Sequence, residues 1–166
     1  MNDRGRTCCF TGHRPTKLPW GYDETDARCV ALKEKIYDIA EAVYESGIRH
    51  FICGMAMGCD LYFCEAVLEL RDRYGDITVE AAIPCATQAS KWKESLRRRY
   101  DVLVRRCDIQ TVLRPRYTHD CMRKRNEYMV ENSSVIIAVY DGELGGTMQT
   151  LMLARRAGLE IIQVAP

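Results

Sequence analysis

Short apolar runs alternate along the chain with longer amphipathic segments. The runs are rich in valine, isoleucine, cysteine and phenylalanine, and they predict buried strands at residues 6–11, 50–54, 78–83, 109–113, 134–140 and 160–164. Apolar positions at helical spacing predict helices at about 23–47, 60–74, 118–132 and 148–157, and a basic helical stretch opened by Gln88 and Trp92. This alternation predicts an α/β fold, a three-layer α/β/α sandwich of Rossmann-like type with a mostly parallel sheet and right-handed crossovers.

The size and composition of the chain favour one domain in the cytoplasm. With 166 residues the chain is as long as a single domain, predicted to span residues 1–166, and no linker or internal repeat divides it. No apolar run approaches the ~18 residues of a membrane-spanning helix, and no basic-then-apolar leader is visible. We therefore expect a cytoplasmic protein without membrane contact.

The nine cysteines are an odd number and include no CxxC pair. Most lie inside apolar segments, so the sequence favours reduced, buried thiols over a disulfide framework. Cys53, Cys59 and Cys64 are the best alternative for a metal site, but their spacing fits no zinc pattern, and no metal is predicted.

Two adjacent glycines lie between the predicted strand at 134–140 and the predicted helix that follows it. Gly145 and Gly146 remove the Cβ atoms that would hold a ligand off the main chain, and Thr147 falls at the N-cap or in the first turn. Free backbone N–H groups at such a junction form an anion cradle, most often for phosphate. The alternative is an ordinary glycine-rich turn, because short glycine motifs often occur without function.

Other unusual residues also follow predicted strands, so a parallel sheet brings them to one edge. A second glycine-rich helix entrance at 54–60 ends in Asp60, which either accepts a bond from a ribose hydroxyl or caps its own helix. Ligands of such folds bind at this edge, near the switch in strand order. The predicted ligand-binding residues are Thr11, Gly12, His13, Arg14, Gly54, Met55, Ala56, Gly58, Asp60, Pro84, Gln88, Trp92, Arg125, Asn126, Asp141, Gly145, Gly146 and Thr147.

Several ordered motifs resemble a known family. TGHRP at 11–15, GMAMGCD at 54–60, IPC at 83–85, RNEYM at 125–129 and YDGELGGT at 140–147 resemble the YpsA-like branch of the SLOG superfamily, which also contains the LOG phosphoribohydrolases and the DNA-processing protein DprA. The resemblance spans nearly the whole chain. It implies a Rossmann-like SLOG domain that binds a nucleotide or nucleotide-derived molecule, with NAD, ADP-ribose or an AMP-like compound as suspected ligand and no other cofactor required.

The resemblance leaves enzymatic activity open. LOG enzymes carry an Arg-Lys-x-x-Met motif and a Pro-Gly-Gly-x-Gly-Thr-x-x-Glu motif; here Asn126 replaces the lysine and Thr150 stands where the catalytic glutamate would be. Threonine cannot act as the carboxylate that stabilises an oxocarbenium ion or activates water. LOG-like hydrolysis of an N-glycosidic bond therefore requires a substitute among Asp60, Glu65 and Asp141, with Arg125 as a further catalytic candidate.

The formal charge of +1 conceals a basic segment. Residues 91–125 hold twelve of the 24 lysines and arginines against four acidic residues. DprA-like binding of single-stranded nucleic acid is therefore a lesser alternative to binding a small nucleotide, because only Trp92, Tyr100 and Tyr117 are available there for stacking. Alternatively, the basic segment is a solvated helical face that contains one or two functional arginines. Homo-oligomerisation is left open by the sequence.

Overall fold

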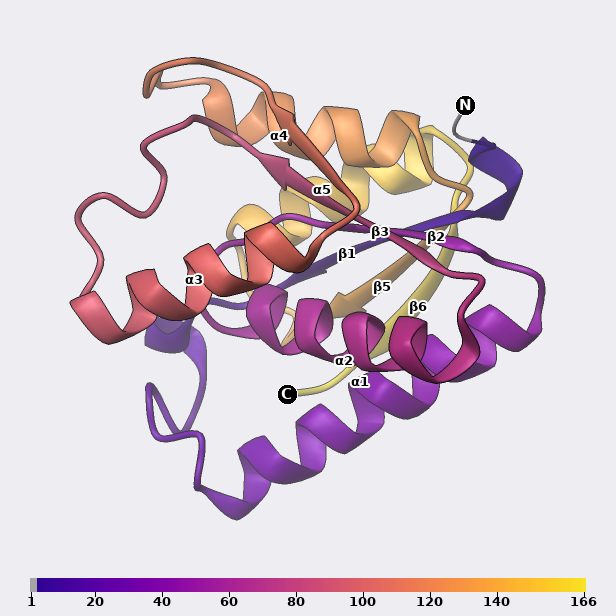
Figure 1. The fold of residues 1–166 in the computed structure, drawn as a ribbon, viewed down its shortest axis with the longest axis horizontal. Coiled ribbons are helices and arrows are strands. Elements are labelled where there is room, and N and C mark those ends of the chain that lie inside the picture. The colour runs from indigo at the N-terminus through magenta and orange to yellow at the C-terminus, as the bar shows by residue number, and fades with distance from the viewer. Residues whose placement is uncertain (1–2) are drawn as a thin grey trace.

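The computed structural model describes residues 3–166, in which helices cover both faces of a six-stranded sheet (Figure 1). The strands are β1 (Thr7–Gly12), β2 (His50–Cys53), β3 (Thr78–Ile83), β4 (Ile109–Val112), β5 (Val135–Val139) and β6 (Glu160–Val164). The α-helices are α1 (Ala27–Glu45), α2 (Cys59–Tyr74), α3 (Glu94–Arg106), α4 (Cys121–Glu131) and α5 (Gly146–Arg156). Short 3₁₀ turns, η1 (Arg4–Arg6) and η2 (Pro15–Lys17), flank the first strand.

The sheet has the order β4-β3-β2-β1-β5-β6, and every paired neighbour among the described strands is parallel. The chain first builds outward from β1 to β4 and then returns to the other side of β1 with β5. The direction of strand order therefore switches between β1 and β5, where Gly12 lies opposite Val139 at the carboxyl edge. A ligand cleft is expected at such a switch.

Two apolar cores hold the three layers together. Helices α1, α2 and α3 cover one face of the sheet, and α4 and α5 cover the other (Figure 1). In α1 the buried side chains recur every three or four residues and form one stripe against the first core: Cys29, Leu32, Ile36, Ala40 and Val43. The smaller second core lies under α4 and α5 and includes Ile52, Met129 and Ile136.

The predicted fold class is confirmed, and most differences in element bounds are a few residues at the ends. The third and sixth strands begin and end where the pattern placed them. The prediction that Gln88 and Trp92 open a helix is wrong. Both belong to successive turns, in which Gln88 N–H donates to the Cys85 carbonyl and Trp92 N–H to that of Ala89, and α3 begins only at Glu94.

All nine cysteines are free and buried, as the sequence predicted. Within residues 3–166, no cluster of three or more histidine, cysteine, aspartate or glutamate side chains is arranged to hold a metal ion. None of the helices in this part of the chain combines the length and apolar character needed to cross a membrane.

Candidate functional site

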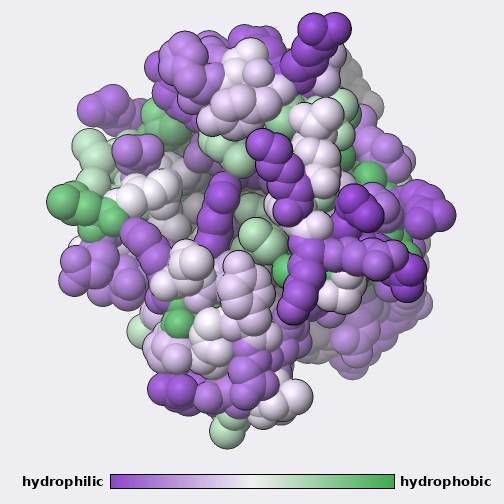
Figure 2. All heavy atoms as spheres, turned by 90° about the vertical axis from the view of Figure 1, so that its left-hand side faces the viewer, coloured by the Kyte–Doolittle hydropathy of each residue, from purple (hydrophilic) through white to green (hydrophobic). Residues whose placement is uncertain are grey.

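A cleft of about 250 Å³ opens at the carboxyl edge of the sheet, at the switch between β1 and β5. Figure 2 looks onto this edge and shows a hollow surrounded largely by hydrophilic side chains. The end of β1, the η2 turn, the start of α2, helix α4 and the start of α5 all contribute to its walls. The sequence-predicted residues that line it are Thr11, Gly12, His13, Arg14, Ala56, Asp60, Arg125, Asn126, Gly146 and Thr147.

The two glycines at the start of α5 have different roles. A Cβ atom added at Gly146 would meet no atom within 4 Å beyond its chain neighbours and the backbone of its own helix, so this position of the first turn faces open space in the cleft. At Gly145, with φ of +155°, the same atom would collide with the ammonium of Lys17. That ammonium donates to the Leu144 carbonyl at 2.8 Å. Gly146 therefore leaves room for a ligand, whereas Gly145 leaves room for Lys17 and does not line the cleft.

His13 connects the loop after β1 to the loop after β5. Its Nε2 lies 3.0 Å from Oδ1 of Asp141, and its Nδ1 lies 3.5 Å from the Thr147 hydroxyl. The backbone N–H of Glu143 and the neighbouring His13 hold the pKa of the Asp141 carboxyl below its usual value. Asp141 is not itself a lining residue; it reaches the cleft through the imidazole of His13.

Arg125 and Asp60 form the buried floor of the site. Both residues are 6% exposed. Arg125 donates from Nη1 to the Gly54 carbonyl and from Nε to the Asn126 side-chain oxygen at 2.8 Å, while Asp60 accepts from the Ala56 N–H at 3.0 Å. Burial raises the pKa of Asp60 and lowers that of Arg125, and the attraction between the two charges offsets part of each shift.

Asp60 does not cap its own helix. The N-cap of α2 is Gly58, which has no side chain, and the carboxylate reaches back to the preceding loop instead. Of the two roles that the sequence left open for Asp60, helix capping is therefore wrong.

The charges on the cleft walls favour an anion. Four cationic side chains line it: Arg14, Lys17, Arg123 and Arg125. Among the described residues, Asp60 is the one lining carboxylate. The N-terminal turn of α5 adds the partial positive charge of its free N–H groups. This balance suits a ligand that carries at least one phosphate.

Three residues of the predicted glycine-rich segment at 54–60 do not line the cleft but pack against residues that do: Gly54, Met55 and Gly58. Gly54 provides the carbonyl that holds Arg125, and a Cβ there would lie 2.8 Å from Arg125 Nη1 and 2.9 Å from Asp60 Oδ2. Met55 is fully buried at φ 62°. Gly58, at φ 85°, lies so close to the loop after β1 that an added Cβ atom would be 2.8 Å from the His13 carbonyl oxygen. These positions are constrained by packing around the site.

The remaining predicted residues lie away from the cleft. Trp92 packs edge-on against Tyr100, with ring centroids 5.1 Å apart, and Gln88 accepts a bond from the Tyr100 hydroxyl at 3.4 Å. Pro84 is buried next to them in sequence and is not a lining residue. This segment follows β3, which lies two strands away from β1. It is therefore at the carboxyl edge of the sheet but not at the switch in strand order, where the cleft lies.

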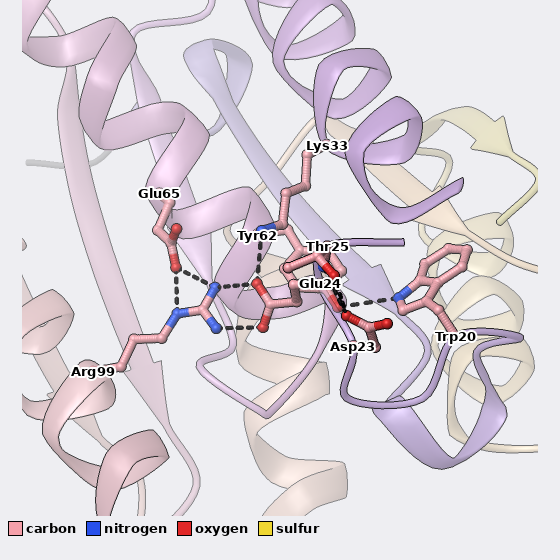
Figure 3. A network of polar contacts seen from close by, with 8 residues as sticks. All are labelled: Trp20, Asp23, Glu24, Thr25, Lys33, Tyr62, Glu65 and Arg99. Atoms are coloured by element: carbon pink, nitrogen blue, oxygen red, sulfur yellow. Dashed lines mark hydrogen bonds and ion pairs between the residues drawn. The ribbon is translucent and has the colours of Figure 1, made fainter. Parts of the chain in front are cut away.

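Glu65 also lies outside the cleft, in a network of ion pairs that joins three helices and a loop (Figure 3). Arg99 of α3 binds Glu65 of α2 at 2.6 Å and Glu24 at 2.5 Å, and Glu24 in turn binds Lys33 of α1 at 2.6 Å. A carboxylate held in this way serves packing of the helices. Glu65 is therefore not available as the substitute carboxylate for catalysis.

Sequence reasoning missed several lining residues, among them Thr16, Lys17, Met122, Arg123 and Gln149. A usable signal existed for the helical ones, because Met122 lies four residues and Arg123 three residues before Asn126, on the same face of α4. No comparable signal marked Lys17, whose position depends on how the loop after β1 folds.

The sheet order and the cleft at its switch define a Rossmann-like α/β domain. The chain belongs to the YpsA family, whose model, described as "YspA SLOG family", matches residues 8–157. The predicted family is thereby confirmed.

Relatives of similar length share about a quarter of the sequence. A UPF0398 protein from Bacillus velezensis is 24% identical over 149 residues, covering 89% of this chain and 81% of the relative. A UPF0398 protein from Bacillus thuringiensis is 26% identical over 161 residues, covering 94% and 85%.

Solved structures confirm the fold. DNA processing protein A (DprA) from Streptococcus pneumoniae superposes with a TM-score of 0.65 at 14% identity, over 96% of this chain and 50% of DprA. DprA from Helicobacter pylori, described for its single-stranded DNA binding mode, gives 0.59 at 14% identity, over 95% and 64%. The protein TM1055 gives 0.55 at 12% identity, over 94% and 72%. The chain thus spans only about half the length of pneumococcal DprA.

Proposed function

We propose that the cleft binds a nucleotide or nucleotide-derived molecule containing phosphate and ribose, such as NAD, ADP-ribose or an AMP-like compound. The protein would act as a sensor, a sequestering protein or a regulator. One observation carries this proposal: a single cleft contains the unobstructed N-terminus of α5 at Gly146, the buried guanidinium of Arg125 and the buried carboxylate of Asp60.

Each part of the cleft suits one part of such a ligand. The N-terminal turn of α5, with Gly146 and Thr147, offers backbone N–H groups and a hydroxyl to a phosphate. Arg125 adds a guanidinium, and its Nη2 contacts the Met122 sulfur at 3.8 Å. Asp60 is an acceptor suited to a ribose hydroxyl.

Hydrolysis of an N-glycosidic bond is the less favoured alternative. Thr150 is buried in the cleft wall, where its hydroxyl donates to the Gly146 carbonyl at 3.0 Å. Among the three carboxylates considered as substitutes, only Asp60 lines the cleft. Asp60 already accepts the Ala56 N–H and lies beside Arg125, which suits a structural and binding role.

Turnover of nucleoside monophosphates is accordingly expected to be near background. Loss of a general acid or base typically removes about 10²- to 10⁴-fold in rate. We expect Thr150→Glu to raise base release from AMP, measured chromatographically, because it restores a carboxylate to the cleft wall. Thr87→Glu, which adds a carboxylate at an exposed position outside the cleft, is the control. Brisk turnover by the wild-type protein that disappears in Asp60→Asn would contradict this expectation.

Binding of single-stranded DNA is a second candidate, favoured by the structural likeness to DprA from Helicobacter pylori. The aromatic side chains argue against it. Of the three in the basic segment, Tyr100 is buried and Trp92 packs against it, so only Tyr117, at 69% exposure, is free to stack on a base. DNA affinity that falls steeply with salt and exceeds nucleotide affinity would favour this candidate instead.

The nucleotide proposal is tested by identifying a ligand and then removing single cations. Native mass spectrometry of freshly purified protein should reveal a bound nucleotide, and titration calorimetry with AMP, NAD and ADP-ribose should measure its affinity. Arg14→Ala is expected to weaken binding at least about tenfold, since one charge-assisted hydrogen bond contributes about 1.5–3 kcal/mol.

The matched control is the combined replacement of Arg97, Arg98 and Arg99 by alanine. These arginines occupy consecutive positions of α3 outside the cleft, where Arg98 pairs with Glu94 and Arg99 belongs to the ion-pair network. The control is expected to retain nucleotide affinity. A larger loss in the triple variant than in Arg14→Ala would contradict the placement of the site.

A further inference from the structure

Of the three histidines in the chain, His13 lines the cleft, and its side chain is 2% exposed. Its Nε2 has two neighbours from one residue: the Asp141 backbone N–H at 3.1 Å and the Asp141 carboxylate at 3.0 Å. An N–H donor requires a bare nitrogen, whereas a carboxylate requires a protonated one. Both protonation states of Nε2 therefore have a partner at hydrogen-bond distance, without any movement of the side chain.

The other ring nitrogen has a partner in either state. Nδ1 lies 3.5 Å from Oγ1 of Thr147, in the first turn of α5, and a hydroxyl can both donate and accept. The neutral ring can therefore carry its proton on Nδ1, with Nε2 accepting from the Asp141 N–H, or on Nε2, donating to the Asp141 carboxylate. In the charged ring, Nδ1–H donates to the Thr147 hydroxyl and Nε2–H to the Asp141 carboxylate. The neutral and charged states thus differ by one proton, and the partners for both are in place.

Charged groups of both signs face the cleft around His13. The cations Arg14, Lys17, Arg123 and Arg125 line it together with Asp60, Asp141 contacts Nε2, and the ring of Tyr140 lies 6.1 Å from the imidazole. A bound phosphate adds up to two negative charges at the helix N-terminus beside Thr147, and these attract a positive imidazole.

We propose that His13 takes up a proton when a terminal phosphate binds in the cleft, so that the site prefers a phosphate monoester to a phosphate diester. This inference rests on the proposed nucleotide site and narrows its ligand to an AMP-like compound, because NAD and ADP-ribose carry a pyrophosphate esterified at both ends and no terminal phosphate. A monoester near charge −2 gains more from the added imidazolium than a diester of charge −1. Affinity for the monoester should consequently rise as the pH falls toward the second ionisation of the phosphate, near pH 6.

Calorimetry with AMP in buffers of different protonation enthalpy measures this proton directly. At about pH 7.5 the phosphate of AMP is almost fully ionised, so an uptake must come from the protein. We expect the observed enthalpy to change with the buffer in the sense of uptake, by a fraction of a proton approaching about one. Cyclic AMP, which has the same base and ribose but a diester, should bind more weakly and with less uptake.

Three variants assign the proton. His13→Gln is expected to abolish uptake and to weaken AMP binding by about tenfold, the effect of one lost charge-assisted contact. Asp141→Asn keeps the backbone N–H and a side-chain oxygen acceptor but removes the negative charge next to Nε2, so its uptake should fall. His119→Gln, at an exposed position outside the cleft, should behave as the wild type.

The outcomes separate this inference from the proposal beneath it. AMP binding without uptake, or uptake that survives His13→Gln, overturns the role of His13 and leaves the nucleotide site standing. Equal affinity for AMP and cyclic AMP overturns the preference for a monoester. Failure of AMP, NAD and ADP-ribose to bind at all contradicts the nucleotide site itself, and the inference with it.

Discussion

Replacing Glu80 by alanine is expected to lower the free energy of unfolding by about 3–5 kcal/mol, the usual effect of breaking a buried charged network. Glu80 is fully buried within β3. Its carboxylate contacts His50 Nε2 at 2.7 Å and accepts bonds from the hydroxyls of Thr111, at 2.6 Å, and Tyr128. Alanine would leave these donors without an acceptor and would also open a cavity.

Chemical denaturation of the variant measures the loss, and Glu69→Ala is the control. Glu69 is an exposed glutamate of α2, so its removal should change stability by no more than about 0.5 kcal/mol. A loss in Glu80→Ala as small as that of the control would show that the buried network contributes little to the fold.

The same network makes stability depend on pH. Burial alone would raise the pKa of Glu80, but the hydrogen bonds from His50, Thr111 and Tyr128 outweigh it and lower the pKa to about 2. Because the folded pKa lies below the unfolded value of 4.5, the stabilisation is present above about pH 4.5 and is lost as the pH falls toward 2. Denaturation midpoints measured across this window should fall in the wild type and fall less in Glu80→Ala.

The fold could be predicted because its determinants are local. Most strands are short apolar runs, and a helix such as α1 carries an apolar stripe at helical spacing, so the alternation of the two predicts a parallel α/β sheet without any long-range information. The order of the strands was not specified. Whether β5 pairs with β1 or with β4 depends on how all five helices pack on the sheet, and that order decides which loops meet.

Most of the correctly predicted site residues follow β1, β2 and β5, whereas Arg125 and Asn126 lie on α4. His13, Arg14 and Gly146 follow or adjoin strands at the switch and line the cleft. Trp92 follows β3, and its large apolar ring packs against Tyr100 instead of facing the edge. Glu65, on α2, illustrates a further limit: sequence places it near Asp60, but its partner Arg99 is 34 residues away on another helix.

The largest effect on binding is expected from Gly146→Val, which should weaken nucleotide affinity by at least about 100-fold. The valine side chain would project into the space where a Cβ meets nothing within 4 Å, and it would hold a phosphate away from the backbone N–H groups of the first turn of α5. Losing two charge-assisted bonds of about 1.5–3 kcal/mol each accounts for a change of this size. Calorimetry with whichever nucleotide binds the wild type gives the measurement.

The fold should survive this substitution, which separates a blocked site from an unfolded protein. Gly146 does not have a positive φ, and the added atoms enter open space, so stability should change by less than about 1 kcal/mol. Met152→Val is the control, because it places the same β-branched residue at an exposed position of the same helix, outside the cleft. If Gly146→Val binds the nucleotide as tightly as this control does, the phosphate does not lie at the N-terminus of α5.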